Sequence, residues 1–354
     1  MLFRSLEVVW LSGSQRKKAK DEAKAKLADG TVKIAVGTHA LFSDDVEFQN
    51  LGLVIVDEQH RFGVAQRLAL KNKGRDVHQL MMSATPIPRT LAMSFFADLD
   101  VSVIDELPPG RTPIKTRLVN NVRRAEVEGF VLNICRKGQQ AYWVCPLIEE
   151  SETLQLQTAT ETLEQLQAAL PELNIGLVHG RMKAAEKAEV MAEFAAGRLN
   201  VLVATTVIEV GVDVPNAALM VIEHAERMGL AQLHQLRGRV GRGAAESVCV
   251  LLFAEPLSEL AKARLKVIYE HTDGFEIARQ DLNIRGPGEF LGARQSGVPM
   301  LRFANLEEDL HLLEQAREIA PLLIEQNPEI VEAHLARWLA SREGYANADR
   351  KSVV

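Results

Sequence analysis

The chain has 354 residues, of which 47% are hydrophobic and 25% are charged, and its formal net charge at pH 7 is −6. This composition indicates a globular protein with room for two domains and a smaller appendage, and no apolar run approaches the roughly 18 residues that span a membrane. The acidic balance gives no general support for nucleic-acid binding, which would have to come from local patches. The three cysteines form no C-x-x-C pair and the start carries no convincing secretory signal, so we expect reduced, buried thiols in a cytosolic protein.

Short apolar runs alternate with helical patterns along the chain, and several runs are apolar throughout, as is typical of parallel strands covered on both faces. Helices are predicted between them, for example over residues 162–173 and 184–197. The alternation predicts doubly wound α/β sheets. The predicted strands are residues 32–38, 51–57, 78–85, 115–119, 140–147, 174–180, 200–206, 218–223 and 247–253.

The segment DELPPGRTPIKTRLV, residues 105–119, holds three prolines and a glycine and is predicted to link two domains. After about residue 258 the strand pattern stops, and the remainder is helical except for a glycine-rich segment at 281–297. We therefore predict an α/β part at residues 1–110, a second α/β domain at 111–258 and a helical region at 259–354. Only 56 residues precede Asp57, so the first sheet is expected to be incomplete.

Two adjacent carboxylates, Asp57 and Glu58, end the predicted strand LGLVIVD. Ligands of open α/β sheets bind beyond the carboxyl ends of the strands, where one acid can organise Mg²⁺ while its neighbour polarises a water during nucleoside triphosphate hydrolysis. Ser83 and Thr85 end the next strand. Taken singly, a solvated Asp-Glu turn and a simple cap remain open as alternatives.

The stretch QLHQLRGRVGR, residues 232–242, places Gln235, Arg239 and Arg242 around two glycines. The planar guanidinium donates several hydrogen bonds and stays charged, so this pattern favours phosphate binding over an ordinary basic helix. Upstream, Thr205 and Thr206 end another strand and are followed by Gly211 and Asp213. These residues suit contacts to a phosphate backbone and coupling between domains, although a helix cap explains Thr206 equally well.

In this order the blocks GTHAL (37–41), DEQH (57–60), SAT (83–85), ATTVIEVGVD (204–213) and QLRGRVGR (235–242) resemble the successive motifs of superfamily 2 helicases. The blocks ATPIPRTLA, DELPPGRTP, AYWVCPLIEES, GLVHGRMK and DLNIRGPGEFLGARQSG resemble the RecG family of bacterial branched-DNA helicases over essentially the whole chain. The last block is shared with transcription-repair coupling translocases, but DEQH and the ending ARWLASREGYANA favour RecG. The resemblance implies two RecA-like doubly wound parallel sheets, the first incomplete, and a C-terminal helical hairpin that serves translocation.

The resemblance also implies residue roles. Asp57 holds Mg²⁺ through water and Glu58 is the general base, while Gln235, Arg239 and Arg242 reach the γ-phosphate of ATP. The residues implied to couple the nucleotide state to the domain interface are His60, Ser83, Thr85, Gly211 and Asp213. The residues implied to contact or respond to DNA are Gly37, Thr38, His39, Thr205, Thr206, Arg264, Arg285 and Gln295, with a structural histidine at 39 and a solvated arginine at 264 as alternatives.

The resemblance implies ATP and Mg²⁺ as cofactors, and forks and Holliday junctions of double-stranded DNA as partners. Single-stranded-DNA-binding protein is a further implied partner. The protein is expected to be a monomer in the bacterial cytoplasm and not to bind membranes. The phosphate loop G-x-x-x-x-G-K-[ST] of such motors has no match, because no Gly-Lys dipeptide occurs in the chain. We therefore expect the C-terminal motor half of a RecG, without its wedge domain and with little ATPase activity by itself. A non-catalytic DNA-binding or regulatory fragment and a transcription-repair coupling translocase are the alternatives.

The basic run RKKAKDEAKAK, residues 16–26, is the strongest local charge cluster. It is typical of a solvated helix face, and a nucleic-acid role is the alternative.

Overall fold

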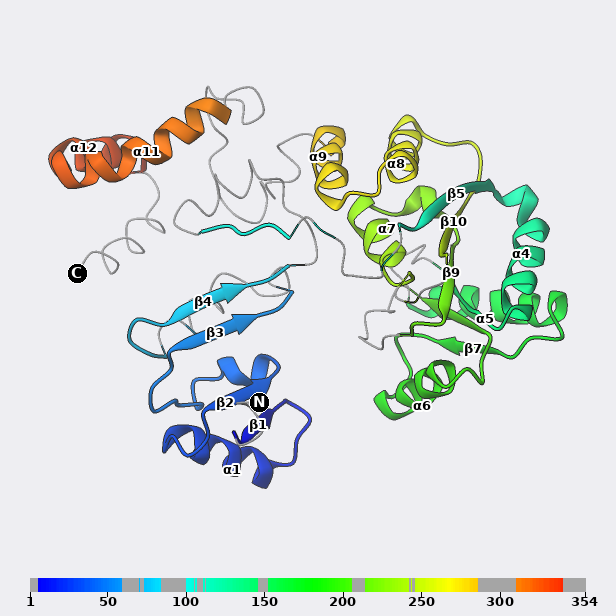
Figure 1. The fold of residues 1–354 in the computed structure, drawn as a ribbon, viewed down its shortest axis with the longest axis horizontal. Helices are drawn as coiled ribbons and strands as arrows, with labels where there is room; N and C mark the ends of the chain where they lie inside the picture. Colours follow the sequence, from blue (N-terminus) through cyan, green and yellow to red (C-terminus); the bar gives the residue numbers. More distant parts are fainter. Residues whose placement is uncertain are drawn as a thin grey trace. The chain divides into compact units, whose positions relative to one another are not determined.

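The computed structural model describes residues 6–58, 70, 73–83, 100–104, 106, 111, 113–145, 152–205, 214–241, 243, 246–285 and 310–339. The chain divides into two compact units, residues 1–84 and 85–354; the first contains two two-stranded sheets and the second a six-stranded sheet (Figure 1). The predicted boundary at residue 110 lies later than this division. It stays a prediction, because few residues between 84 and 113 are described.

The first unit contains two short parallel strand pairs. Strand β1 (Val8–Leu11) pairs directly with β2 (Ile34–Gly37), and helix α1 (Lys17–Ala28) connects the two strands. Strand β3 (Leu53–Val56) pairs with β4 (His78–Met81). The 3-10 turn η1 (His39–Phe42) follows β2. The basic run 16–26 forms most of α1, where Ala23 and Leu27 are buried, two of the five lysines are exposed and the other three are half-buried.

Strands of the first unit bury one face only. In β1, Val9 and Leu11 are buried while Val8 and Trp10 are about half exposed, and β3 repeats this alternation. Runs that are apolar throughout, such as VVWL and LVIV, are expected in sheets covered on both faces. Among the described residues, α1 packs on the buried face of β1, and the predicted incompleteness of the first sheet stays a prediction.

The second unit is a six-stranded parallel sheet with the order β5-β10-β9-β6-β8-β7. The strands are β5 (Lys115–Asn120), β6 (Gln140–Cys145), β7 (Ile175–Val178), β8 (Val201–Thr205), β9 (Ala217–Ile222) and β10 (Val248–Phe253). Strands β6, β8 and β9 are buried along their whole length, as their continuous apolar sequences predict. The α/β fold class is therefore confirmed.

Helices cover both faces of this sheet. Side chains of α4 (Arg124–Arg136) and α5 (Glu152–Ala169) pack in one core cluster, and those of α6 (Ala184–Ala195), α7 (Leu230–Arg237), α8 (Glu259–Glu270) and α9 (Gly274–Arg285) pack in another. The 3-10 turns η3 (Asn121–Arg123) and η4 (Ala225–Arg227) precede α4 and α7. Farther along, α11 (Leu310–Gln326) and α12 (Pro328–Leu339) contact each other.

The cysteines lie inside the second unit. Cys135, Cys145 and Cys249 are buried and free, and burial raises the pKa of their thiols to about 11, 12 and 12, respectively. They are small core residues, as predicted. Among the described residues, no helix combines the length and apolar character needed to cross a membrane.

A partly buried ion pair fixes the start of α4. Glu223, which follows β9, accepts a hydrogen bond from Trp143 Nε1 at 3.0 Å and pairs with Arg124. The Arg124 guanidinium also lies 5.0 Å from the centroid of the Trp143 ring, so the cation has two favourable partners in the core. This arrangement anchors α4 against the centre of the sheet.

Candidate functional site

Asp57 and Glu58 lie at the carboxyl end of β3, beside the carboxyl end of the parallel strand β4. Asp57 and Glu58 follow β3 directly, and the Met82 N–H at the end of β4 donates to Val56 O at 2.8 Å. This bond holds the two strand ends together, so Ser83 lies near the acids. The structure therefore brings together three of the residues that the sequence predicts to act on a nucleotide.

Glu58 has an uncommon backbone conformation. Its φ is +51°, in the left-handed region that non-glycine residues rarely occupy, and its N–H donates to Asp57 Oδ1 at 2.8 Å. Asp57 is exposed and Glu58 is half-buried. Residues with such strained backbone conformations concentrate at functional sites. The different exposure of Asp57 and Glu58 agrees with different roles for the two carboxylates.

The residues after β2 lie at the carboxyl end of that strand. The Thr38 N–H donates to Leu11 O at 3.1 Å, and a Cβ at Gly37 would lie 2.1 Å from the same oxygen. Glycine is therefore required at 37 by the close approach of β1. Thr38 and His39 are exposed, and the His39 ring lies 6.0 Å from that of Phe42.

We expect Gly37→Ala to destabilise the first unit by about 1–3 kcal/mol, because the added methyl group forces β2 away from Leu11. Hydrogen exchange of the α1 and β1 amides would measure the effect. Gly13→Ala is the matched control, since nothing lies within 4 Å of a Cβ built there. Equal exchange in the two variants would contradict the prediction.

In the second unit, Gln235 lies in α7 and Arg239 follows its C-terminus, and both are half-buried. Arg111 Nη2 donates to Gly238 O at 2.8 Å, which ties this segment to the residues ahead of β5. Gly241 has a φ of +80°, and a Cβ there would lie 2.9 Å from Ile114. The glycines thus allow the arginine-rich segment to turn closely against the entry to the sheet.

Gly243 and Pro215 approach each other closely at the amino-terminal edge of this sheet. A Cβ at Gly243 would lie 2.3 Å from the carbonyl oxygen of Pro215, which precedes β9. In the sequence, Gly243 comes one residue after Arg242 and Pro215 two residues after Asp213. Gly211, Asp213 and Arg242 themselves lie outside the described residues, as do His60, Thr85, Thr206 and Gln295.

Thr205 has a different setting. It ends β8 at the carboxyl edge, and it is 4% exposed, so its side chain belongs to the interior of the sheet. The structure does not bring it to Arg239, because the segment around Gly241 and Gly243 lies at the opposite edge. Its predicted contact with the DNA backbone stays a prediction.

Sequence reasoning missed the most heavily bonded side chain of this region, Arg237, which is 3% exposed. Its Nη1 donates to Ile268 O at 2.8 Å, His271 O at 2.9 Å and Thr116 Oγ1 at 3.2 Å, and its Nη2 donates to Thr272 O at 3.3 Å. The guanidinium thereby satisfies carbonyls at the end of α8 and in the turn to α9. The only sequence signal was a further arginine inside the motif.

His234 shares this environment. Burial, and then the charge of Arg237, lower the pKa of His234 to about 4, and its Nδ1 accepts from Arg237 Nη2 at 3.1 Å. The folded state therefore favours the neutral ring.

We expect this ring to make stability pH-dependent. The contribution of His234 to the free energy of unfolding is fully present above the unfolded-state pKa near 6.5. About 2 kcal/mol of it is lost as the pH falls toward 4, because in that range the unfolded state binds a proton at His234 more readily than the folded state does. Urea unfolding of wild type and His234→Gln between pH 8 and 4 would measure the difference. A constant difference between the two curves would contradict the prediction.

The predicted DNA-responsive arginines of the C-terminal region are in α8 and α9, which pack on each other and on α7. Arg264 is half-buried, and its Nε is buried without a hydrogen-bond partner among the described residues. Arg285 is the last residue of α9. Both are thus attached, through the helix packing, to the segment that carries Gln235 and Arg239.

A metal ion would have few protein ligands here. Among the described residues no group of three or more His, Cys, Asp or Glu side chains could hold one. Nucleotide-bound Mg²⁺ is usually held by one or two carboxylates together with phosphate oxygens and waters, so the exposed Asp57 at a strand end fits that group.

The sequence matches three helicase family descriptions: "DEAD/DEAH box helicase" over residues 2–94, "Helicase conserved C-terminal domain" over 127–244 and "ATP-dependent DNA helicase RecG, domain 3, C-terminal" over 271–339. Among curated relatives, the ATP-dependent DNA helicase RecG of Escherichia coli strain K12 is 56% identical over 348 residues, or 97% of this chain and 50% of the relative. That of Thermotoga maritima is 53% identical over 315 residues, covering 89% of this chain and 40% of the relative.

Among solved structures, one of RecG bound to a three-way DNA junction matches with a TM-score of 0.67 and 48% identity, covering 87% of this chain and 40% of that one. The chain spans about half the length of the curated relatives that it matches. Over nearly all of its residues the chain therefore belongs to the RecG family of superfamily 2 helicases.

Proposed function

We propose that this chain is the C-terminal motor half of an ATP-dependent translocase and helicase that remodels branched double-stranded DNA in recombination and repair. The observation that carries the proposal is the match to RecG over nearly the whole chain, which includes both the acid pair and the arginine segment. The related structure bound to a three-way DNA junction supports branched DNA as the partner.

In this proposal the residues of the two units act on one ATP. Mg²⁺, when bound near Asp57, neutralises charge on the phosphates. Glu58 takes a proton from the attacking water, and its fixed position beside Asp57 supports that role. Arg239 and Arg242 stabilise the charge that develops on the transferred phosphoryl group, and Gln235 helps to position it.

DNA movement would follow from the packing of α7 on α9. Arg237 of α7 also donates to Ile268 O and His271 O at the end of α8, so a shift of Arg239 on loss of the γ-phosphate would displace the turn between α8 and α9. Arg264, Arg285 and Gln295 are the proposed residues that pass this shift to duplex DNA. Gly37, Thr38 and His39 are proposed to lie near the DNA backbone from the first unit.

We propose that the isolated chain hydrolyses little ATP, because it holds no G-x-x-x-x-G-K-[ST] loop to bind the β- and γ-phosphates. A DNA-stimulated ATPase assay on the purified chain tests this point. A turnover rate within the usual range of helicases would contradict it.

Fluorescence anisotropy with a labelled three-way junction and a linear duplex tests the motor-half proposal. We expect binding that weakens with salt and favours the junction. Absence of DNA binding would contradict the proposal. The second candidate is a non-catalytic DNA-binding module, which the missing phosphate loop supports. DNA binding that does not change on addition of ATP and Mg²⁺, in a protein that carries this chain together with a phosphate loop, would favour it.

A further inference from the structure

Strand β5 is an edge of the six-stranded sheet. It pairs with β10 on one side, from Lys115 opposite Val248 to Asn120 opposite Phe253, and with no other strand among the described residues. A free strand edge presents backbone N–H and C=O groups that a further strand can bond. With six residues, β5 is longer than the opposite edge, β7, which has four.

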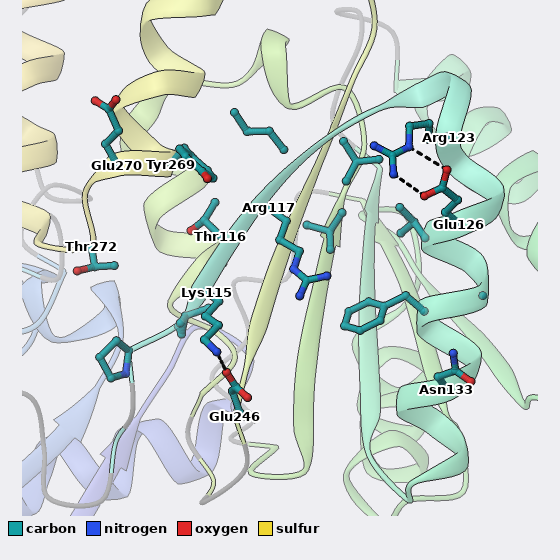
Figure 2. A pocket seen from close by; sticks show the side chains of 18 residues that line it. Lys115, Thr116, Arg117, Arg123, Glu126, Asn133, Glu246, Tyr269, Glu270 and Thr272 are labelled. Carbon is teal, nitrogen blue, oxygen red and sulfur yellow. Dashed lines mark hydrogen bonds and ion pairs between the residues drawn. The ribbon is translucent and has the colours of Figure 1, made fainter.

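A groove runs along this edge. It has a volume of about 1570 Å³, and its walls are α4 on one side and the end of α8 on the other (Figure 2). Leu118 and Phe130 give it apolar surface, and Tyr269, which is 55% exposed, stands at the α8 side. An extended chain placed here would therefore contact both a strand edge and apolar side chains.

The charges in the groove are mostly paired with each other. Arg123 binds Glu126 through two hydrogen bonds of 2.8 and 2.6 Å, and Lys115 pairs with Glu246. Arg117 differs from these residues. Its guanidinium lies 5.3 Å from the centroid of the Phe130 ring, is exposed, and has no ion pair among the described residues.

We propose that this groove binds an extended, acidic segment of a partner protein, which adds to the sheet beside β5. Main-chain hydrogen bonds to the β5 edge would supply affinity, and alternate side chains would supply specificity. A carboxylate of the segment would meet Arg117, where the Phe130 face already orients the guanidinium. Apolar side chains at the intervening positions would lie on the opposite face of the sheet, on the side of Leu118 and Tyr269.

Charge favours a peptide over nucleic acid in this groove. Glu126, Glu246 and Glu270 line it together with the cations, and two of those cations already have carboxylate partners. A phosphodiester strand carries a charge at every nucleotide and needs several free cations along its path. A peptide with one or two carboxylates matches the single available guanidinium.

The test uses the whole chain and a fluorescein-labelled peptide of alternating valine and aspartate. We expect saturable binding by anisotropy, weakened about tenfold or more by Arg117→Glu. Lys137→Glu is the matched control, because this exposed residue at the end of α4 lies outside the groove and its charge change is the same. We expect it to leave the peptide affinity within about twofold of wild type.

Two further measurements decide whether a strand is added. Amides of β5 should exchange more slowly with solvent in the complex, and a peptide with proline at its central positions should not bind, since proline removes the ladder donor. The proposal would be overturned if Arg117→Glu and Lys137→Glu weakened peptide binding equally. It would also be overturned if the peptide left hydrogen exchange of the β5 amides unchanged, or if the proline peptide bound as tightly as the valine-aspartate peptide. Slow β5 exchange that depends on protein concentration without peptide would overturn it in favour of a second copy of the chain.

Discussion

Arg237→Met is expected to lower the stability of the second unit by about 3 kcal/mol, because it removes the donor to buried carbonyls whose desolvation is then uncompensated. Those acceptors are Ile268 O and His271 O, with Thr116 Oγ1 beside them. Methionine fills most of the space that the arginine stem occupies, so lost hydrogen bonding dominates over cavity formation. The measurement is hydrogen exchange at β9 and β10, which reports this unit separately from the first.

Two variants make the prediction sharp. Arg237→Lys keeps the charge but presents donors from one nitrogen, so it should retain part of the bonding and give an intermediate loss. Arg136→Met removes an exposed arginine that pairs with Glu172 on the surface, and it should have little effect. If Arg237→Met and Arg136→Met changed exchange equally, the guanidinium would not be the anchor that its contacts suggest.

How far the sequence predicts this structure depends on how local each signal is. The strands β8, β9 and β10 lie within two residues of their predicted ends, because continuous apolar runs bounded by polar residues fix a buried parallel strand. Helix α5 begins at Glu152, ahead of the predicted start at 162. The threonines in this stretch have weak helix propensity, so packing against the sheet decides the boundary. The strand β1 was not predicted, although its run VVWL is as apolar as the run LVIV of β3.

In the candidate site, too, some features were predictable from the sequence and others depend on the folded packing. That Asp57, Glu58 and Ser83 follow adjacent strands was predictable from the chain order, and the structure agrees. The buried side chain of Thr205 was not, because a position at a strand end does not say which way the residue points. Arg237 could not be found either, since its acceptors lie more than 30 residues away along the chain, in a turn that only the folded packing brings near.

Glu58→Gln is expected to lower kcat for ATP by about 10²–10⁴-fold, the usual contribution of a general base, in a protein that carries this chain together with a phosphate loop. Glutamine keeps the shape of the side chain and the left-handed turn, in which the Glu58 N–H donates to Asp57 Oδ1, but it cannot take the proton from water. KM for ATP should change little, because the loss concerns the transition state and not nucleotide binding. Steady-state kinetics with saturating DNA measures both constants.

The matched control is Glu47→Gln, which neutralises an exposed carboxylate of the same unit away from the strand end. It should leave kcat within about twofold, since long-range charge effects at an exposed position are screened. Asp57→Asn provides a second contrast, because loss of a ligand should raise the Mg²⁺ concentration needed for half-maximal activity. The general-base assignment fails if Glu58→Gln retains most of kcat, or if added Mg²⁺ restores the activity of Glu58→Gln as it does that of Asp57→Asn.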